Sequence, residues 1–257
     1  MSALANKNKI VAIIPARYGS TRFPGKPLAL INGHPMIEWV YKGVSKTEEL
    51  DAVYVATDDQ RIFDCVTGFG GKVLMTSSEH QSGSDRLAEC SQILKLEDDD
   101  VLLNIQGDEP LIKASIVREL IRSIEDENVA MGTLKEVFYD EDELSNPNVI
   151  KVITNMNDEA IYFSRSIIPY ARNTISDMKY YRHVGLYAYR VGFLREYTQW
   201  GKSDLESIEG LEQLRVLEHG YKIKVLEVEF KSVSVDTPEQ IDRVKELMLE
   251  DESGYQL

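Results

Sequence analysis

The sequence predicts an α/β protein built on a doubly wound, mostly parallel sheet. Short apolar runs rich in Val and Ile recur through roughly the first 130 residues. These runs are almost continuously apolar, which is typical of strands covered on both faces. Segments with a helical spacing of apolar residues lie between them. This alternation favours parallel strands joined by helices.

Strands and helices are expected in turn over this part of the chain. The expected strands are Ile10–Pro15, Ala52–Thr57, Lys72–Thr76 and Val101–Gln106. The expected helices are Pro35–Lys46, Asp59–Phe69, Ser84–Leu96 and Ala114–Ile124, and the pair Gly70-Gly71 ends the second one. Sheets of this kind bind ligands outside the carboxyl ends of their strands, where the segments PARYGS and QGDEP lie.

The second half of the chain is less regular. A hairpin is expected within Val149–Arg165, with NMNDE as its turn, and a long strand over Tyr181–Arg190. A helix over Leu211–His219, a strand over Lys222–Phe230 and a closing helix over Thr237–Glu250 complete the prediction. We expect one domain over residues 1–257, with a lobe at roughly 135–200 inserted over the sheet edge. The terminal DESGYQL is expected to be loose.

The charge balance argues against nucleic acid or an anionic membrane as partner. Lys and Arg number 29 and Asp and Glu 43, a formal net charge of −14, whereas either partner requires a positive surface. The N-terminus is too short and polar for a signal peptide, and no apolar run approaches the roughly 20 residues of a membrane span. Cys65 and Cys90 are expected to be buried, reduced thiols. We therefore expect a cytoplasmic protein.

A basic loop interrupts this acidic chain directly after the first expected strand. The segment VAIIPARYGSTRFPGKPLAL gathers Arg17, Arg22 and Lys26, and Gly19 and Ser20 allow a ligand to approach the backbone closely. Cations and backbone N–H groups at a strand end can bind phosphate. The loop matches neither the GxxxxGK[ST] nor the GxGxxG pattern. The alternative is a solvated basic surface loop.

Two acidic segments are candidates for a metal site. In NIQGDEPLI, Asp108 follows an apolar strand, and Mg²⁺ usually binds one or two such carboxylates together with substrate oxygens. The alternative there is a turn whose acids cap a helix. In SVDTPEQI, Asp236 also follows an expected strand. The alternative is that Asp236 or Thr237 caps a helix with Pro238 in its first turn.

These segments stand with others in a fixed order along the chain. The order is IPARYGSTRFPGKPL, HQSGSDRL, NIQGDEP, NPNVIKV, YFSRSIIP, RHVGLYAYR, LEQLRVLEHG and VDTPEQI. In this order they resemble the CMP-Kdo synthetases, the 3-deoxy-manno-octulosonate cytidylyltransferases, from about Lys9 to Leu249. The resemblance implies a nucleotide-diphospho-sugar transferase-like fold with a smaller lobe for sugar binding and dimerisation. Two small departures are GSD, where Gly-Thr and an acid are common, and His34, where Lys is frequent.

The resemblance implies Mg²⁺-dependent transfer of CMP from CTP to the anomeric hydroxyl of Kdo, with release of pyrophosphate. The hydroxyl would attack the α-phosphate in line, without a covalent enzyme intermediate. Lys26 and Arg17 would act as catalytic cations, with Lys26 stabilising the charge on the α-phosphate. Asp108 and Asp236 would hold the metal ion.

The resemblance also assigns substrate contacts. CTP contacts would come from Ala16, Arg17, Gly19, Arg22, Lys26, Ser82, Gly83 and Arg86. Sugar contacts would come from Gln106, Arg165, His183, Tyr187, Glu212 and Gln213. From the residues alone, His183 and Tyr187 could equally be structural, and HQSGSDRL could be a helix start capped by Ser84 or Asp85.

The family further suggests a homodimer whose product feeds lipopolysaccharide or capsule synthesis. Two alternatives stay open at this point. The chain could be a synthetase for a related acidic sugar, such as 8-amino-Kdo or a sialic acid. It could also be a catalytically silent module that binds nucleotide sugars, although the joint presence of Lys26, Asp108 and Asp236 argues against that.

Overall fold

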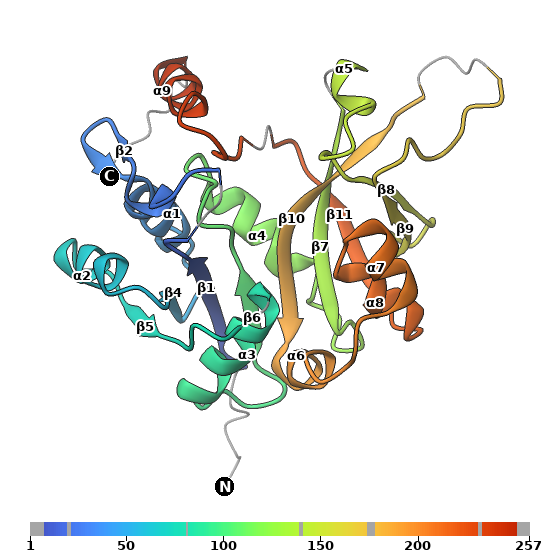
Figure 1. Cartoon of the computed structure of the whole chain (residues 1–257). Helices are drawn as coiled ribbons and strands as arrows, with labels where there is room; N and C mark the ends of the chain where they lie inside the picture. Colours follow the sequence, from blue (N-terminus) through green and yellow to red (C-terminus); the bar gives the residue numbers. More distant parts are fainter. Residues whose placement is uncertain are drawn as a thin grey trace, which may run out of the picture. The chain divides into compact units, whose positions relative to one another are not determined.

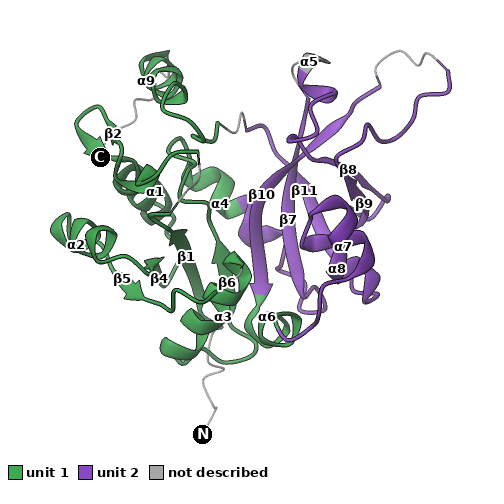
Figure 2. Cartoon of the chain, in the orientation of Figure 1, with its two compact units in different colours: residues 1–118, 190–198, 232–257 green, residues 119–189, 199–231 purple. Residues whose placement is uncertain are grey.

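The computed structural model describes residues 8–19, 22–80, 82–138, 141–173, 178–230 and 233–250. Ser20 of the basic loop and the terminal DESGYQL lie outside these residues. The chain divides into two compact units (Figure 2). Unit 1 comprises Met1–Arg118, Arg190–Thr198 and Ser232–Leu257, and unit 2 comprises Glu119–Tyr189 and Gln199–Lys231. The placement of a lobe over the sheet edge stays a prediction.

Unit 1 is built on a parallel sheet in which β1 (Ile10–Ala16) lies between two other strands. The order is β6-β1-β4-β5, and these strands span Val101–Asn104, Ile10–Ala16, Ala52–Thr57 and Val73–Met75 (Figure 1). β1 pairs in parallel with both β4 and β6, and β4 pairs in parallel with β5. The residues from Val11 to Ile14 are at most 3% exposed, as the continuous apolar run predicts. The predicted strands and the α/β class are confirmed.

Helices alternate with these strands along the chain. They are α1 (Met36–Ser45), α2 (Gln60–Gly68), α3 (Gly83–Ile93), α4 (Ala114–Arg122), α6 (Val191–Tyr197) and α9 (Gln240–Glu250). Shorter elements follow β1, namely the 3₁₀ turn η1 (Lys26–Leu28) and the strands β2 (Leu30–Ile31) and β3 (His34–Pro35). The ends of α2 follow from its sequence. Asp59 caps it by accepting a hydrogen bond from Arg61 N at 2.9 Å, and Gly70 adopts φ +81° just beyond its end.

The C-terminal segment is attached to unit 1 by apolar packing. One buried cluster joins residues of the chain end to residues near β2 and α1, namely Val235, Val244 and Met248 with Ile31, Met36, Trp39 and Leu111. α9 begins at Gln240, so the predicted start at Thr237 is wrong. The reason is that Gln240 Oε1 accepts hydrogen bonds from Asp236 N at 2.5 Å and Thr237 N at 2.9 Å, which folds these residues into a turn.

The described part of unit 2 has a mixed sheet and short helices. Its elements are β7 (Met131–Val137), α5 (Glu141–Leu144), β8 (Lys151–Thr154), β9 (Ala160–Ser164), β10 (Tyr181–Arg190), α7 (Asp204–Glu209), α8 (Gln213–Glu218) and β11 (Ile223–Glu227). β7 pairs antiparallel with β10 and parallel with β11. The predicted hairpin is confirmed as β8 and β9, and Asn155 N donates to Glu159 O at 2.9 Å across its turn. The segments of β7 and α7 carry no predicted element.

A bulge in β10 sets the spacing of its side chains. Val184 pairs with Leu134 of β7, but the next pair is Tyr187 with Thr133, so three steps along β10 match one step along β7. The Thr133 hydroxyl donates to the carbonyl oxygen of Leu186 at 2.6 Å and stabilises the bulge. In a regular strand, residue 185 would pair with Thr133 and lie beside His183 on the same face. Because of the bulge, Tyr187 takes that position instead.

Within the part of the chain that the structure describes, no helix is long and apolar enough to cross a membrane. Both cysteines are free thiols, as predicted; Cys90 is buried and Cys65 is partly buried. Burial, together with the neighbouring Glu89 carboxylate, raises the pKa of the Cys90 thiol to about 12. Cys90 is therefore a packed core residue rather than a reactive one.

Gly107→Ala should destabilise unit 1. A Cβ at position 107 would lie 2.9 Å from the carbonyl oxygen of Pro15, a backbone atom of β1 that cannot move without distorting the sheet. We expect the free energy of unfolding to fall by about 1–3 kcal/mol, measured by urea denaturation.

Gly68→Ala at the end of α2 is the matched control for this substitution. Among the described residues, apart from its chain neighbours and the backbone of α2, no atom lies within 4 Å of a Cβ at position 68. Alanine is also the better helix former, so stability should hold or rise by up to about 1 kcal/mol. Equal effects of the two substitutions would contradict the steric explanation.

Candidate active site

The basic loop closes on itself at the carboxyl end of β1. Gly25 N donates to Tyr18 O at 2.8 Å, and Gly25 has a φ of +73°, in the left-handed region. A side chain at position 25 would also meet the Tyr18 ring at 3.0 Å. Glycine therefore lets the chain turn into η1, whose first residue is Lys26.

Tyr18 is braced from the start of α2. The guanidinium carbon of Arg61 lies 3.3 Å from the centre of the Tyr18 ring, which is a cation–π contact. Asp59 holds Arg61 in turn, with Nε–Oδ1 and Nη2–Oδ2 distances of 2.9 and 2.6 Å. Because Asp59 is also the cap of α2, the basic loop is tied to this helix.

Lys26 joins two carboxylates from distant parts of the chain. Its Nζ donates to Asp108 Oδ2 at 2.6 Å and to Asp236 Oδ1 at 3.3 Å, and its side chain is only 14% exposed. Arg22 Nη2 lies 3.1 Å from Asp236 Oδ1 but is largely exposed. Two predicted phosphate-binding cations and both predicted metal ligands therefore meet at one place. The partial burial of Lys26 makes its ion pairs stronger than surface ones.

A backbone hydrogen bond aligns the two acidic segments. Val235 N donates to Asp108 O at 2.9 Å, and Val235 is fully buried in the cluster that attaches α9. Asp236 thus follows directly after an anchored residue. Its carboxylate pairs with Lys26 and Arg22, and the last helix starts at Gln240. The alternative in which Asp236 or Thr237 caps that helix is therefore wrong.

The two carboxylates suit a hard divalent cation. Among the described residues, no group of three or more His, Cys, Asp or Glu side chains could hold a metal ion. Mg²⁺ commonly binds one or two carboxylates and takes its other ligands from substrate phosphates and water. Asp108 and Asp236 already converge on one cation, the Lys26 ammonium, so the donor set fits Mg²⁺.

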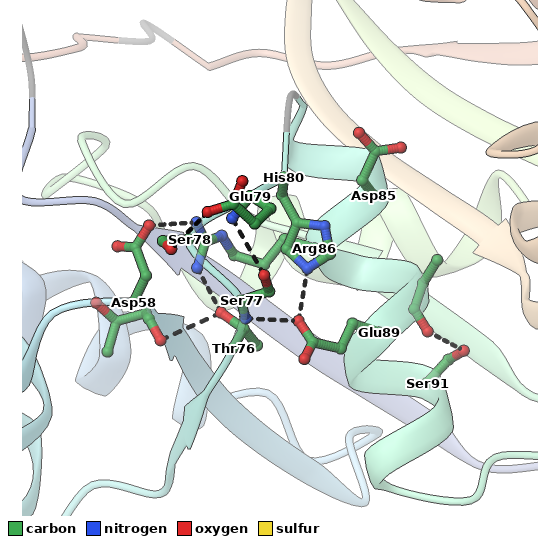
Figure 3. A network of polar contacts seen from close by, with 12 residues as sticks. Asp58, Thr76, Ser77, Ser78, Glu79, His80, Asp85, Arg86, Glu89 and Ser91 are labelled. Atoms are coloured by element: carbon green, nitrogen blue, oxygen red, sulfur yellow. Dashed lines mark hydrogen bonds and ion pairs between the residues drawn. The ribbon is translucent and has the colours of Figure 1, made fainter.

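Arg17 reaches from the basic loop to the segment before α3. Its Nη2 donates to the carbonyl oxygens of His80 at 2.9 Å and Ser82 at 3.3 Å. Glu89 fixes that segment, since its Oε2 accepts from His80 Nε2 at 2.5 Å and from Ser77 N at 2.9 Å (Figure 3). Although burial opposes it, these hydrogen bonds lower the pKa of Glu89. The basic loop and the segment before α3 are thereby linked to one another.

Arg86 lies beneath this segment rather than at its surface. Its side chain has no exposed surface, and it donates to Thr76 Oγ1 and, at 2.9 Å, to Asp58 Oδ2 (Figure 3). A buried guanidinium held by two partners supports the loop from inside. The position of Arg86 therefore does not support the expected contact with the nucleotide.

Ser82 and Gly83 form the start of α3. Ser82 Oγ accepts from Asp85 N and Asp85 Oδ2 accepts from Ser82 N, both at 3.1 Å, which is a capping box. The helix-start alternative is thus right about the element, but the cap is Ser82 rather than Ser84 or Asp85. The backbone here is half-buried.

Four of the predicted sugar residues gather around β10 and α8 in unit 2. The rings of His183 and Tyr187 are 5.3 Å apart, a consequence of the bulge between them. The Tyr187 hydroxyl donates to Gln213 Oε1 at 3.4 Å, and Gln213 is 4% exposed. Glu212 precedes Gln213 at the start of α8.

His183 is a neutral imidazole that carries its hydrogen on Nε2. Its Nε2 lies 2.9 Å from Thr133 Oγ1, whose own hydrogen goes to the Leu186 carbonyl, so Nε2 is the donor. Burial and the Arg182 cation lower the pKa of His183 to about 3. Burial and the Glu212 carboxylate raise the pKa of Tyr187. Both rings are therefore uncharged hydrogen-bonding groups near neutral pH.

Arg165 lies just after β9 and is anchored to other segments. Its Nε donates to Glu209 O at 2.5 Å, Nη1 to Pro147 O at 2.8 Å and Nη2 to Gly210 O at 3.4 Å. These acceptors are neutral carbonyls, and among the described residues no carboxylate pairs with the guanidinium itself; the Glu209 carboxylate accepts from the backbone N–H of Arg165, at 3.0 Å.

The remaining predicted residues lie in unit 1. Gln106 is half-buried and lies in the loop that follows β6, the loop that also carries Asp108. Ala16 is the last residue of β1 and is 2% exposed, whereas Gly19 is exposed. The sequence does not identify the residues that brace these loops, such as Arg61 and Glu89, because their partners are distant. The cap at Asp59 is the one local signal that could have indicated such a role.

Known proteins are similar to this chain over most of its length. The cytidylyltransferase family model matches residues 11–223. The 3-deoxy-manno-octulosonate cytidylyltransferase of Syntrophus aciditrophicus (strain SB) is 48% identical over 242 residues, which is 94% of this chain and 98% of the relative. That of Fusobacterium nucleatum subsp. nucleatum is 49% identical over 237 residues, 92% and 95% of the two chains. A solved structure of a CMP:2-keto-3-deoxy-manno-octonic acid synthetase complexed with CTP gives a TM-score of 0.89 at 43% identity, over 95% of this chain and 99% of that one.

A parallel sheet with cations and carboxylates beyond its strand ends is the architecture of a nucleotide-binding α/β enzyme. The chain belongs to the family of the 3-deoxy-manno-octulosonate cytidylyltransferases. The family resemblance, the enzyme class and the fold class predicted from the sequence are thereby confirmed.

His183→Gln should weaken the pH dependence of stability. The pKa of His183 is about 3 in the folded chain, against about 6.5 when unfolded, so its neutral form contributes fully above pH 6.5 and this contribution is lost as the pH falls toward 3. Through this group the wild type should lose about 1–2 kcal/mol of unfolding free energy between pH 7 and pH 5. Urea denaturation at both pH values measures the difference.

Val184→Ala, the buried neighbour on β10, is the control for this experiment. It should lower stability by a similar amount at both pH values, because it does not titrate. If His183→Gln kept the pH slope of the wild type, His183 would not be held neutral.

Proposed function

We propose that this chain transfers CMP from CTP to the anomeric hydroxyl of Kdo, 3-deoxy-D-manno-octulosonate, and releases pyrophosphate. The observation that carries the proposal is the meeting of the Lys26 ammonium with the carboxylates of Asp108 and Asp236, at 2.6 and 3.3 Å. A partly buried cation beside two metal-type carboxylates suits charge stabilisation at the α-phosphate of a nucleotide. The names of relatives at 48 and 49% identity support the choice of substrate.

The basic loop would hold the triphosphate. Arg22 and Lys26 now pair with carboxylates, and they would share their hydrogen bonds with phosphate oxygens, which are strong acceptors. Lys26 is mostly shielded from water, so it would stabilise the charge on the α-phosphate and on the departing pyrophosphate. Arg17 and the backbone at Ala16 and Gly19 would complete the contacts.

Asp108 and Asp236 would hold Mg²⁺. Bound there, Mg²⁺ would lower the pKa of the sugar hydroxyl and reduce the repulsion between the two anionic substrates. The chain itself orients the carboxylates, through the hydrogen bond from Val235 N to Asp108 O and through Lys26. Attack by the sugar hydroxyl would be in line, with positioning and electrostatics in place of a covalent intermediate.

Sugar recognition would fall to Gln106 and to residues of unit 2. Arg165 would bind the carboxylate of the sugar, since its guanidinium is held by neutral carbonyls. Glu212 would accept hydrogen bonds from sugar hydroxyls, and the uncharged His183 and Tyr187 would contribute polar contacts with Gln213. Cytosine would be recognised by the backbone of Ser82 and Gly83, supported from below by Arg86.

We also infer a cytoplasmic homodimer that supplies lipopolysaccharide or capsule synthesis. A reducing compartment agrees with the two free thiols. Exposed apolar side chains of unit 2 agree with a protein contact; Ile161, Tyr170 and Ile208 are 57%, 87% and 79% exposed. Light scattering measures the mass, and a monomer would contradict the dimer.

Pyrophosphate release tests the reaction directly. The protein is mixed with CTP and Mg²⁺, without sugar or with Kdo, 8-amino-Kdo or sialic acid. We expect release that depends on the sugar and is fastest with Kdo. Absence of Kdo-dependent release would overturn the proposal and favour a silent binding module. Faster turnover of another sugar would assign the chain to that substrate.

Asp236→Asn should abolish turnover while CTP still binds. The substitution keeps the shape but removes the charge that would hold the metal, so we expect a loss of about a hundredfold or more in kcat. CTP affinity, measured by calorimetry without metal, should change little, because Arg17, Arg22 and Lys26 remain. Pyrophosphate release measures the first effect.

Asp242→Asn on α9 is the matched control, since its carboxylate contacts Lys245 Nζ at 3.0 Å on an exposed helix face. It should leave turnover unchanged. Near-normal turnover by Asp236→Asn would remove this carboxylate from the catalytic machinery.

A further inference from the structure

Lys151, at the start of β8, has no exposed surface. Its ammonium donates to the carbonyl oxygens of Asn146 at 2.8 Å, Val149 at 2.9 Å and Arg165 at 2.9 Å. An ammonium has three N–H donors, so all of them are used. Burial and the neighbouring Arg165 cation lower the pKa of Lys151. Burying a cation among neutral acceptors is costly, so Lys151 is a candidate for a role beyond packing.

The three carbonyls belong to the segments that fix Arg165. The carbonyl of Arg165 accepts from Lys151, and its N–H donates to Glu209 Oε2 at 3.0 Å. Its Nη1 donates to Pro147 O, which lies in the turn of residues 146–149, and Lys151 holds this turn through the carbonyls of Asn146 and Val149. Lys151 thus holds the backbone of Arg165 directly. It also fixes, through the turn, the carbonyl of Pro147 that accepts from the Arg165 side chain.

The anchoring leaves part of the guanidinium for a ligand. An arginine side chain has five N–H donors. Among the described residues, three of them donate to carbonyl oxygens: Nε to Glu209, Nη1 to Pro147 and Nη2 to Gly210. One N–H on each terminal nitrogen is left by this count. Two such donors match the two oxygens of a carboxylate.

We propose that Lys151 is a positioning residue for the acidic sugar, because it fixes the turn 146–149 and the backbone of Arg165 so that the remaining donors of Arg165 meet the sugar carboxylate. This inference rests on the proposed function, in which Arg165 binds that carboxylate. Lys151 itself does not touch the sugar, since it has no exposed surface and no unused donor. Its charge, buried close to Arg165, adds to the positive charge there, and the Glu209 carboxylate, which accepts from Arg165 N, offsets part of it.

Lys151→Met tests this role, because it keeps much of the volume and removes both the donors and the charge. We expect the KM for Kdo, measured at saturating CTP, to rise about tenfold. The KM for CTP and kcat should change by less than about twofold. Lys151→Gln keeps two N–H donors without the charge and should fall between wild type and Lys151→Met. If Lys151→Met does not fold, Lys151→Gln carries the test.

Val152→Ala is the matched control for stability. Val152 is the next residue on β8, is fully buried and faces the opposite side of the strand. Its truncation should lower Tm as Lys151→Met does, but leave the KM for Kdo unchanged. If Val152→Ala raised the KM for Kdo equally, Lys151 would serve stability only, and the proposal would be overturned.

A double-mutant cycle asks whether Lys151 acts through Arg165. Lys151→Met combined with Arg165→Ala should have the same KM for Kdo as Arg165→Ala alone, because the group that Lys151 positions is already gone. Full additivity would overturn the proposal. If Arg165→Ala left the KM for Kdo unchanged, the sugar contact in the proposed function would fail, and the present inference with it. If Arg165→Ala raised it and neither Lys151 variant did, only the present inference would fail.

Discussion

The ion pairs of Lys26 with Asp108 and Asp236 are the interaction on which the candidate site depends. They join three segments, since Asp108 lies 82 positions and Asp236 lies 210 positions from Lys26. Two neighbouring carboxylates repel one another, and the ammonium offsets that repulsion. The third segment is held by the apolar cluster under α9 and by the bond from Val235 N to Asp108 O. Packing away from the reacting groups therefore fixes where a charged group stands.

Buried cations support the cations that would meet substrate. Arg86 in unit 1 and Lys151 in unit 2 have no exposed surface, and each holds a loop from inside. Among the described residues, the guanidinium groups of Arg17 and Arg165 donate to backbone carbonyls and pair with no carboxylate, which suits contact with an anion. A chain with a formal net charge of −14 can therefore present local positive charge. Net charge describes the whole surface, whereas an anionic substrate responds to the groups within a few ångströms.

Local patterns predicted much of unit 1 and less of unit 2. The strand Ala52–Thr57 is found with its predicted bounds, because a continuous apolar run between two turns is a local signal. The start of the last helix was not predictable. The residues DTPE look like a capped helix start, but the Gln240 side chain accepts hydrogen bonds from Asp236 N and Thr237 N and holds them in a turn. The bulge in β10 depends on Thr133 of another strand. This bulge brings the rings of His183 and Tyr187 into contact, and the residues RHVGLYAYR alone do not predict it.

The sequence by itself determined the family and the residue types of the site, because each motif is a linear pattern and eight of them stand in one order. Only the tertiary structure decided what each residue does within its motif. Arg86, in a motif assigned to the nucleotide, lies inside, and Lys151, in NPNVIKV, lies beneath the backbone of Arg165. The physical reason is that burial and hydrogen bonding depend on segments brought together by the packed core. A motif fixes the identity of a side chain but not its partners.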